Sequence, residues 1–327
     1  MRFASVILDI PTQALDAPYA YLVPDAEHAL GDAAEGGFSV QVGCAVLVPF
    51  GGRQAVGFVV SIEESDEAPD GVDFGKLKPI VRALSPAYFD EEGAACARYL
   101  AERYIAPLSA CVRLFTPPSA VPRIVRSRDG RWQLEQPAVG EVDDRWVRLG
   151  AAAESFEPRK NAVKQIAVLE ALKRGELRVA ELTAEFGAVS GVLKALEAHG
   201  AIEVFHRRRM RGMETRPFTP TGKPQLTPGQ DEALVAIAAA CDRACGEVVL
   251  VDGVTGSGKT EVYLQAIERT LEQGRTACVL VPEISLTPQT VARFRGRFGD
   301  TVAVMHSRMT AGERFDQWEA VRLGKKR

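Results

Sequence analysis

Eight consecutive residues, Gly253 to Thr260, constrain this chain more than any other stretch. They read Gly-Val-Thr-Gly-Ser-Gly-Lys-Thr and match the phosphate-loop pattern G-x-x-x-x-G-K-[ST] at every fixed position. The apolar run 247–251 before them predicts a strand, and 261–273 after them has helical spacing of apolar residues. A strand, a glycine turn and a helix N-terminus in this order form an anion site, because backbone N–H groups and the helix dipole face the phosphates.

This stretch therefore predicts a nucleoside triphosphate site. We expect the Lys259 ammonium to reach the β- and γ-phosphates and the Thr260 hydroxyl to hold Mg²⁺. A chance glycine-rich turn is the alternative, and the flanking strand and helix patterns argue against it. Upstream, Gln230 follows a helix-start pattern, and with the loop in place we favour a role for its amide in reading the adenine edge. The predicted ATP-binding residues are Gln230, Gly253, Val254, Thr255, Gly256, Ser257, Gly258, Lys259, Thr260 and Glu261.

Length and charge set limits on the rest of the chain. Its 327 residues predict two or three domains, and 46% hydrophobic with 25% charged residues is ordinary globular usage. The net charge of −3 excludes a global positive field, so any nucleic-acid site must be a local patch. The six cysteines lack zinc spacing, and we expect buried, reduced thiols. No signal peptide or apolar membrane span is predicted, so we expect a cytoplasmic protein without a membrane partner.

The N-terminal region reads as a small β-domain. Strand-like runs at 2–10, 19–23, 40–49 and 55–62 are separated by glycine and proline, and 88–104 then has helical spacing. Residues 119–159 are mixed and polar, and we interpret them as a linker with one hairpin that turns at Asp129-Gly130.

The middle region predicts three short helices, 162–173, 180–186 and 189–199, followed by a strand at 201–205. This order is typical of a winged helix, with Ser190 as a cap for the third helix and Gly200 ending it. The run from His206 to Arg211 is the densest positive cluster in the chain. Its arginines suit phosphate oxygens, but a solvated linker is an equally good reading.

After the phosphate loop, strand patterns at 276–281 and 301–305 alternate with helix patterns at 290–298 and 310–323. This β-α-β-α order predicts a mostly parallel sheet with helices on both faces.

Together these features resemble the PriA family of replication restart helicases along essentially the whole chain. The most specific stretches are 253–263, Val281-Pro-Glu-Ile-Ser-Leu-Thr-Pro-Gln289, and His306-Ser307 with Glu313-Arg314 and Trp318. A looser match covers Val48-Pro49-Phe50-Gly51, Leu77-Lys78-Pro79-Ile80, and Tyr104 with Pro107.

The resemblance implies a multidomain α/β fold. Its parts are a β-rich 3′-end DNA-binding domain at 1–118, a linker at 119–159, a winged helix at 160–205, a basic linker at 206–223, and the first RecA-like lobe from 224 to 327. It also implies DNA contacts in the loop after the second strand of that lobe. The candidate DNA contacts are Tyr19, Tyr21, Arg207, Arg208, Arg209, Arg211, Pro282, Thr287 and Gln289; Thr287 could equally cap the next helix.

Two departures from the family pattern matter. The aspartate that the family places between two aromatic residues is Ala20 here, in Tyr19-Ala20-Tyr21. An alanine cannot accept hydrogen bonds from a terminal base, although the tyrosines could still stack on one. The sequence also stops at Arg327, before the family's DEEH box, zinc-binding insertion and second lobe. We therefore expect zinc only beyond this stretch, and a P-loop lobe that is incomplete, with exposed strand edges at 245–327.

The resulting hypothesis is an ATP-dependent 3′-to-5′ helicase that recognises stalled forks and starts primosome assembly. Forked and single-stranded DNA, single-stranded DNA-binding protein and other primosome proteins are the partners that the resemblance implies. The alternatives are a non-enzymatic fork-binding regulator with a vestigial P-loop, and a P-loop ATPase of another family. Because hydrolysis needs a carboxylate near Mg²⁺, we expect little ATPase activity from these 327 residues alone.

Overall fold

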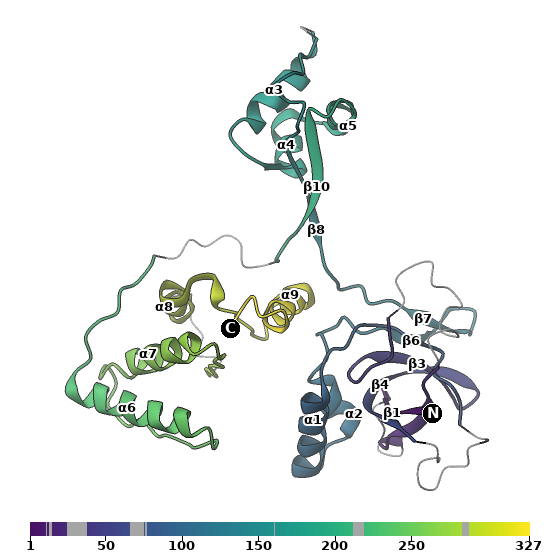
Figure 1. The fold of residues 1–327 in the computed structure, drawn as a ribbon, viewed down its shortest axis with the longest axis vertical. Coiled ribbons are helices and arrows are strands. Elements are labelled where there is room, and N and C mark those ends of the chain that lie inside the picture. Colours follow the sequence, from purple (N-terminus) through teal and green to yellow (C-terminus); the bar gives the residue numbers. More distant parts are fainter. Residues whose placement is uncertain are drawn as a thin grey trace. The chain divides into compact units, whose positions relative to one another are not determined.

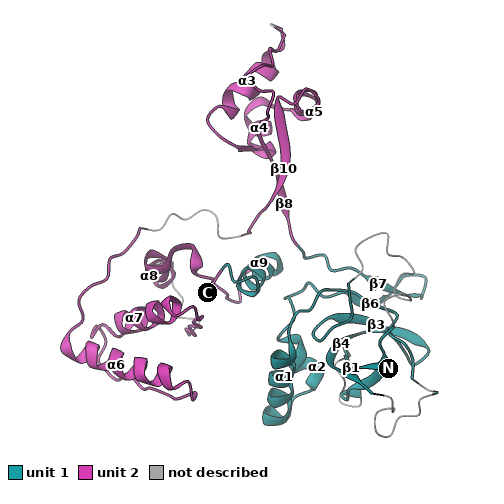
Figure 2. Ribbon diagram, in the orientation of Figure 1, with its two compact units in different colours: residues 1–140, 310–325 teal, residues 141–309, 326–327 magenta. Residues whose placement is uncertain are grey.

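A computed structural model describes the chain except residues 11, 13–14, 25–37, 66–74, 76, 160, 212–218 and 283–287. The chain divides into two compact units, shown in Figure 2. One comprises residues 1–140 and 310–325, and the other comprises 141–309 and 326–327.

The first unit contains a five-stranded antiparallel sheet with the order β2-β1-β4-β3-β5. Strands β1, β3 and β4 of this sheet are labelled in Figure 1. Its strands are β1 (Arg2–Leu8), β2 (Tyr19–Leu22), β3 (Ala45–Phe50), β4 (Arg53–Glu64) and β5 (Arg82–Ala83). β3 and β4 form a tight hairpin through Gly51 and Gly52, which both have positive φ angles of 55° and 79°. Two-residue hairpins need this conformation, and glycine adopts it without a steric penalty. The β-rich prediction for this region is confirmed.

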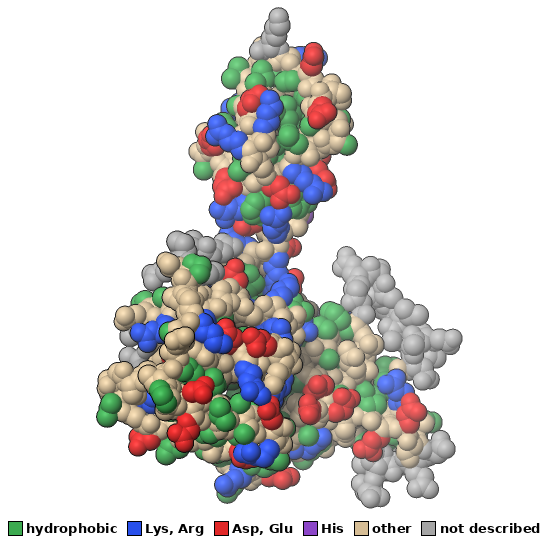
Figure 3. All heavy atoms as spheres, turned by 60° about the vertical axis from the view of Figure 1, so that its left-hand side comes forward, with side chains coloured by type: hydrophobic (Ala, Val, Ile, Leu, Met, Phe, Trp, Pro, Cys, Tyr) green, Lys and Arg blue, Asp and Glu red, His purple; other side chains and the backbone are tan. Residues whose placement is uncertain are grey.

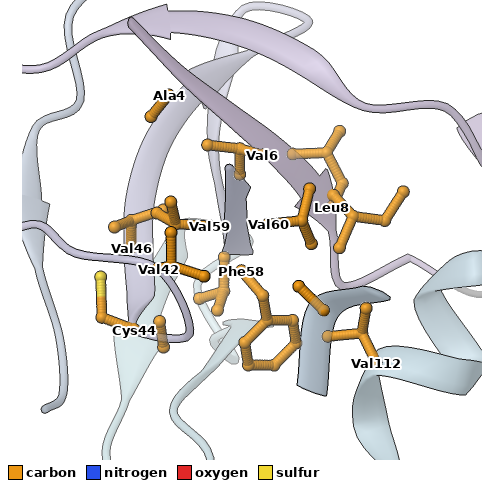
Figure 4. Close-up of a cluster of buried hydrophobic side chains, with 14 of the residues drawn as sticks. Ala4, Val6, Leu8, Val42, Cys44, Val46, Phe58, Val59, Val60 and Val112 are labelled. Carbon is orange, nitrogen blue, oxygen red and sulfur yellow. The ribbon is translucent and has the colours of Figure 1, made fainter. Parts of the chain in front are cut away.

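The core of this unit lies between the sheet and two helices, α1 (Glu91–Tyr104) and α2 (Leu108–Arg113). Figure 4 shows Val6, Leu8, Phe58 and Val112 converging there, and all four are fully buried. Helix α2 is not predicted by the sequence pattern. Its start is fixed by the Asp16 carboxylate, which accepts from the backbone N–H groups of Leu108 and Ser109 at 2.6 and 3.0 Å.

The expected hairpin at Asp129-Gly130 is confirmed as β6 (Arg123–Arg126) and β7 (Trp132–Glu135). The first unit also includes α9 (Ala311–Arg322), within the predicted helix at 310–323. Trp318 of α9 meets Tyr88 edge-to-face, with ring centroids 6.4 Å apart.

The second unit begins with a three-stranded sheet of order β10-β8-β9 and three helices. In chain order the elements are β8 (Asp143–Leu149), α3 (Val163–Leu172), β9 (Leu177–Arg178), α4 (Val179–Phe186), α5 (Ser190–Ala198) and β10 (Ile202–Arg208). The three helices lie where the sequence predicts them. Val147, Leu182 and Leu196 are fully buried in the core that they share.

Two strands extend into segments that the sequence predicts to be linkers. β8 lies inside the expected linker 119–159, and β10 extends to Arg208, inside the expected basic linker 206–223. The two strands pair antiparallel from Ile202↔Leu149 to Arg208↔Asp143, and the Arg209 N–H then donates to the Val142 carbonyl at 2.8 Å. Val142, before β8, and Arg209, after β10, therefore lie side by side.

The predicted cap of α5 is also wrong, because Ser190 is the first helical residue and Val189 holds the cap position without a side-chain bond. Gly200 does follow the helix with a φ of +69°, as its predicted role at the helix end requires.

The remainder of the second unit contains α6 (Pro228–Arg243), α7 (Lys259–Glu272) and α8 (Pro288–Phe298). The strands predicted at 247–251, 276–281 and 301–305 are wrong for this structure, because the described residues of these runs are not in a sheet. Several apolar side chains of the first two runs face outward, with Val248 95% exposed and Leu280 91% exposed, whereas those of 302–304 are half-buried. A strand needs hydrogen bonds from neighbouring strands, whereas a helix bonds within itself, so helices form here and strands do not.

The expectation that all six cysteines are buried is wrong. Cys44 and Cys111 are buried, and burial raises the pKa of both thiols, but Cys96, Cys245 and Cys278 are exposed. Within the described ranges, no helix is long and apolar enough to cross a membrane. The same residues contain no group of three His, Cys, Asp or Glu side chains placed to hold a metal ion.

Candidate functional site

The phosphate-loop residues form a turn that leads directly into α7. Gly258 precedes the helix with a φ of +86°, and a Cβ added there would lie 2.3 Å from Nε2 of Gln230. The positive φ favours glycine at this position, and a side chain there would also have to displace the Gln230 amide. The sequence pattern thus takes the local form that it predicts, although the preceding residues are not in a strand.

Lys259 and Thr260 occupy the first turn of α7. The Lys259 ammonium donates to the Gly253 carbonyl and, at 3.0 Å, to the Val254 carbonyl, so it folds back over the loop. The first N–H groups of a helix have no acceptor within that helix, and they carry the positive end of its dipole. This arrangement concentrates positive charge and hydrogen-bond donors at the loop.

The loop opens into a pocket of about 690 Å³. Its walls are residues 254–261 with Leu264, the upstream residues Thr221, Gly222 and Pro224, and Arg293 and Arg297 of α8. Pockets of about 300–1,000 Å³ hold ligands of nucleotide size. A nucleoside triphosphate fits both the volume and the donors, and the pocket brings together Val254 to Glu261 of the predicted set.

Gln230 lies beside the loop but is already engaged. Its Oε1 accepts from the Thr227 N–H at 2.9 Å, which closes the first turn of α6, and its Nε2 donates to the Ser257 carbonyl at 2.7 Å. Gln230 thus connects α6 to the phosphate loop, and an adenine ring would have to replace these two bonds. Its predicted adenine role remains a prediction.

A buried ion pair that no sequence motif predicts lies next to the loop. The Arg297 side chain is 4% exposed, and its Nη2 donates to Oε1 of Glu261 at 2.8 Å. Its Nη1 donates to the Gly222 carbonyl at 2.7 Å, and its Nε lies 3.7 Å from Oε1 of Glu268. The one available signal was the spacing of Arg293 and Arg297, which puts two arginines on one face of a predicted helix.

The tyrosines of β2 differ in what they can bind. Tyr21 is 4% exposed, its hydroxyl donates to the Pro49 carbonyl at 3.1 Å, and burial raises the pKa of its phenol to about 12. A nucleobase cannot stack on a ring packed in the core, so we correct the predicted DNA contact at Tyr21. Tyr19 is half-buried and meets Phe50 edge-on, with centroids 5.1 Å apart, and it remains a candidate.

The basic cluster is balanced by nearby carboxylates. Arg207 pairs with Glu176 and stacks 4.4 Å over the Trp146 ring, Arg208 pairs with Glu141 at 2.7 Å, and Arg209 lies 3.5 Å from Asp144. The solvated-linker alternative does not fit Arg207 and Arg208, because both belong to β10. Figure 3 shows positive and negative side chains interspersed on the visible face of the described chain, without a single basic stripe. DNA binding by Arg207, Arg208, Arg209 and Arg211 remains a prediction.

The remaining candidates flank a segment that the structure leaves out. Pro282 and Gln289 are both exposed, and Gln289 is in the first turn of α8. Thr287 lies outside the described residues, so neither its DNA role nor its capping role is tested.

Comparisons with known proteins give matches in two parts of the chain. Residues 5–117 match the 3′ DNA-binding domain of PriA, and residues 227–326 match the DEAD/DEAH box helicase family. Over 98% of its length the chain is 29% identical to the replication restart protein PriA of Bacillus subtilis, and it covers 45% of that protein. It is 32% identical to PriA of Haemophilus influenzae over 99% of its own length and 40% of that relative.

The resemblance to PriA stated from the sequence is confirmed. PriA of Synechocystis gives the same result, at 28% identity over 98% of this chain and 44% of the relative. The chain thus spans less than half the length of these relatives. The phosphate loop and the pocket residues from Val254 to Arg297 lie in the helicase match. The β-sheet of the first unit lies in the DNA-binding match from residue 5 onward.

Proposed function

We propose that this chain, which carries a PriA 3′ DNA-binding domain and a DEAD/DEAH box helicase region, is the DNA-holding and ATP-binding part of a replication restart helicase. Such an enzyme recognises stalled forks, moves 3′ to 5′ with ATP, and starts primosome assembly in the cytoplasm. Its proposed partners are forked and single-stranded DNA, single-stranded DNA-binding protein and other primosome proteins.

One observation carries this proposal: the phosphate loop sits at the N-terminus of α7 and opens into a pocket of nucleotide size. In the proposal the loop amides and Lys259 hold the phosphates of ATP, and the Thr260 hydroxyl holds Mg²⁺. The bound nucleotide supplies the free energy for movement along DNA. Gln230, at the loop, would sense the base.

We further propose that α3, α4, α5 and β8–β10 are a winged helix. Three short helices beside a small sheet support this reading, with α5 as the helix that would enter a DNA groove. The central strand β8 precedes the helices in the chain, so sequence order alone conceals the domain's first element.

The helicase region is proposed to be an incomplete RecA-like lobe. The exposed apolar runs around Val248, Leu250 and Leu280 support this, because side chains of this kind normally face the interior of a parallel sheet. The strands that would complete the sheet are proposed to lie in sequence that the relatives have and this chain does not include.

Nucleotide binding by the 327-residue chain tests the proposal directly. A fluorescent N-methylanthraniloyl-ADP should bind in the presence of Mg²⁺. Lys259→Ala should weaken its binding at least tenfold, whereas the surface control Lys164→Ala should not. Equal binding by both variants would contradict the assignment of the phosphate loop.

DNA binding separates the competing functions. A labelled fork with an exposed 3′ end should bind more tightly than linear duplex, with an affinity that falls steeply as salt rises. Nucleotide binding without a preference for forks would favour a P-loop ATPase of another kind. Fork binding without nucleotide binding would favour a non-enzymatic regulator. This is a specific second candidate because the described residues on either side of the loop, 246–258 and 274–282, are not in a sheet.

A further inference from the structure

We propose that Arg297 is a positioning residue that neutralises Glu261 and thereby keeps the phosphate loop able to accept an anion. This inference rests on the proposed nucleotide function and adds a requirement to it. Arg297 lies on α8, outside the phosphate-loop motif, and lines the pocket; the effect proposed here is the one that it exerts through Glu261.

The first step is the geometry of Arg297. Its side chain is 4% exposed, and its guanidinium bonds to the Gly222 carbonyl and to the Glu261 carboxylate at 2.7 and 2.8 Å. It therefore connects three separate segments: α8, α7 and the chain that leads into α6. A buried arginine with such partners has one fixed orientation, because other positions would leave its charge unpaired.

The second step is the place of Glu261. It directly follows Thr260 in the first turn of α7, and it lines the same pocket as Lys259. Its carboxylate accepts from Arg297 and, at 2.9 Å, from Nε2 of Gln265. An acidic residue in the first helical turn is favourable for the helix, but it places a negative charge where a triphosphate must bind.

The third step is the charge balance of the pocket. Lys259, Arg293 and Arg297 supply positive charge to its walls, and Glu261 is the acidic residue among the wall-forming residues that the structure describes. Without Arg297, an unpaired carboxylate would lie beside the loop in a partly buried site, where charges are weakly screened. Repulsion between that carboxylate and the phosphates would then lower the affinity for the nucleotide.

A purely structural role for Arg297 is the competing explanation, and Glu268 distinguishes the two. Glu268 is the second carboxylate near Arg297, at 3.7 Å, and it also pairs with Lys223 at 2.7 Å. It lies two turns further along α7 than Glu261 and does not line the pocket. If Arg297 is purely structural, replacing either carboxylate should change only the stability of the fold. If Arg297 balances charge, replacing Glu261 should change the nucleotide affinity and replacing Glu268 should not.

The test is a titration of N-methylanthraniloyl-ADP with Mg²⁺ into the full chain and five variants, with far-ultraviolet circular dichroism as a fold control. Arg297→Gln should weaken binding about tenfold, and Arg297→Lys should stay within about threefold of the unsubstituted chain. Glu261→Gln should bind more tightly than the unsubstituted chain, because it removes the negative charge beside the phosphates while Arg297 keeps its positive charge. The double variant Arg297→Gln with Glu261→Gln should recover to within about threefold, and the control Glu268→Gln should not change the affinity.

Several results would overturn the inference. A double variant as weak as Arg297→Gln, or unchanged binding by Arg297→Gln itself, shows that Glu261 does not mediate the effect. Should Arg297→Gln fail to fold, Glu261→Gln still decides, since a loss above threefold contradicts the predicted repulsion. If the unsubstituted chain does not bind the nucleotide, the proposed function fails and this inference fails with it. Normal binding by that chain with no effect at Arg297 overturns the inference alone.

Discussion

The β-domain of the first unit and the phosphate-loop region of the second unit differ in whether their apolar runs form strands. In the β-domain, the strand runs of the sequence pair with one another and their side chains are buried, as for Leu8 at 0% exposure. In the phosphate-loop region, runs of equal apolar character stay outside any sheet, and Leu250 is 88% exposed. Helix α1 of the first region and helices α7 and α8 of the second form where the sequence places them. Apolar character alone therefore does not make a strand; a strand also needs neighbours to pair with.

The same side-chain change in the two regions should have very different effects. Leu8→Ala removes a fully buried side chain and leaves a cavity, so it should lower the free energy of unfolding by about 2–5 kcal/mol. Leu250→Ala, at an exposed site, should change it by less than about 0.5 kcal/mol. Urea unfolding followed by circular dichroism measures both. A large decrease in the free energy of unfolding for Leu250→Ala would show that its segment is packed in solution. The two regions would then not differ in this respect.

High pH should destabilise the β-domain through Tyr21. The pKa of Tyr21 is raised to about 12 by burial, so the folded state favours the protonated phenol. The raised pKa contributes to the free energy of unfolding, and this contribution is fully present below the unfolded pKa of about 10. It is lost as the pH rises from 10 to 12, which lowers the free energy of unfolding by on the order of 2 kcal/mol. Tyr21→Phe cannot ionise, so its unfolding free energy should fall less over this range. Equal pH dependence in both proteins would exclude Tyr21 as the responsible group.

Each region ends one helix with a non-glycine residue in the left-handed conformation, which allows a matched comparison of backbone strain. Ile105 ends α1 with a φ of 52° and is 91% exposed, and Ala244 ends α6 with a φ of 51°. Ile105→Gly should stabilise the β-domain by about 1 kcal/mol, because a β-branched side chain is strained there and little packing is lost. Ala244→Gly should gain only a few tenths of a kcal/mol. Thermal unfolding of both variants checks the order, and a loss of stability at Ile105→Gly would contradict the strain argument.

Much of the fold follows from local sequence signals. Alternation and turn residues locate β1, β3 and β4, and helical spacing locates α1, α3, α7 and α8. Strand β8 could not be located in this way, because Val147 is its only fully buried residue within a polar segment and its partner β10 lies more than fifty residues later. Helix α2 was missed because the carboxylate that starts it belongs to Asp16, far away in sequence.

In the site, too, features that a sequence motif specifies could be predicted, and features that depend on contacts between distant segments could not. The phosphate-loop pattern encodes its own turn, so the positions of Gly258 and Lys259 could be predicted. Arg297 has no motif, and its importance depends on α8 lying against α7, which no local pattern encodes. Tyr21 was misassigned because an alternating strand does not reveal which of its faces becomes the interior.

The antiparallel pairing of β8 with β10 has a consequence for how this chain is assembled. Asp143 and Arg208 are paired, so the first and last residues of the segment 143–208 lie on neighbouring strands. The segment is therefore an insert that is connected to the rest of the chain through a two-stranded stem. A short bridge between positions 142 and 209 would span the gap that the 2.8 Å bond already closes. Evolution or a protein engineer can therefore remove, exchange or enlarge the helical insert while the connection between the sequences on either side keeps its length.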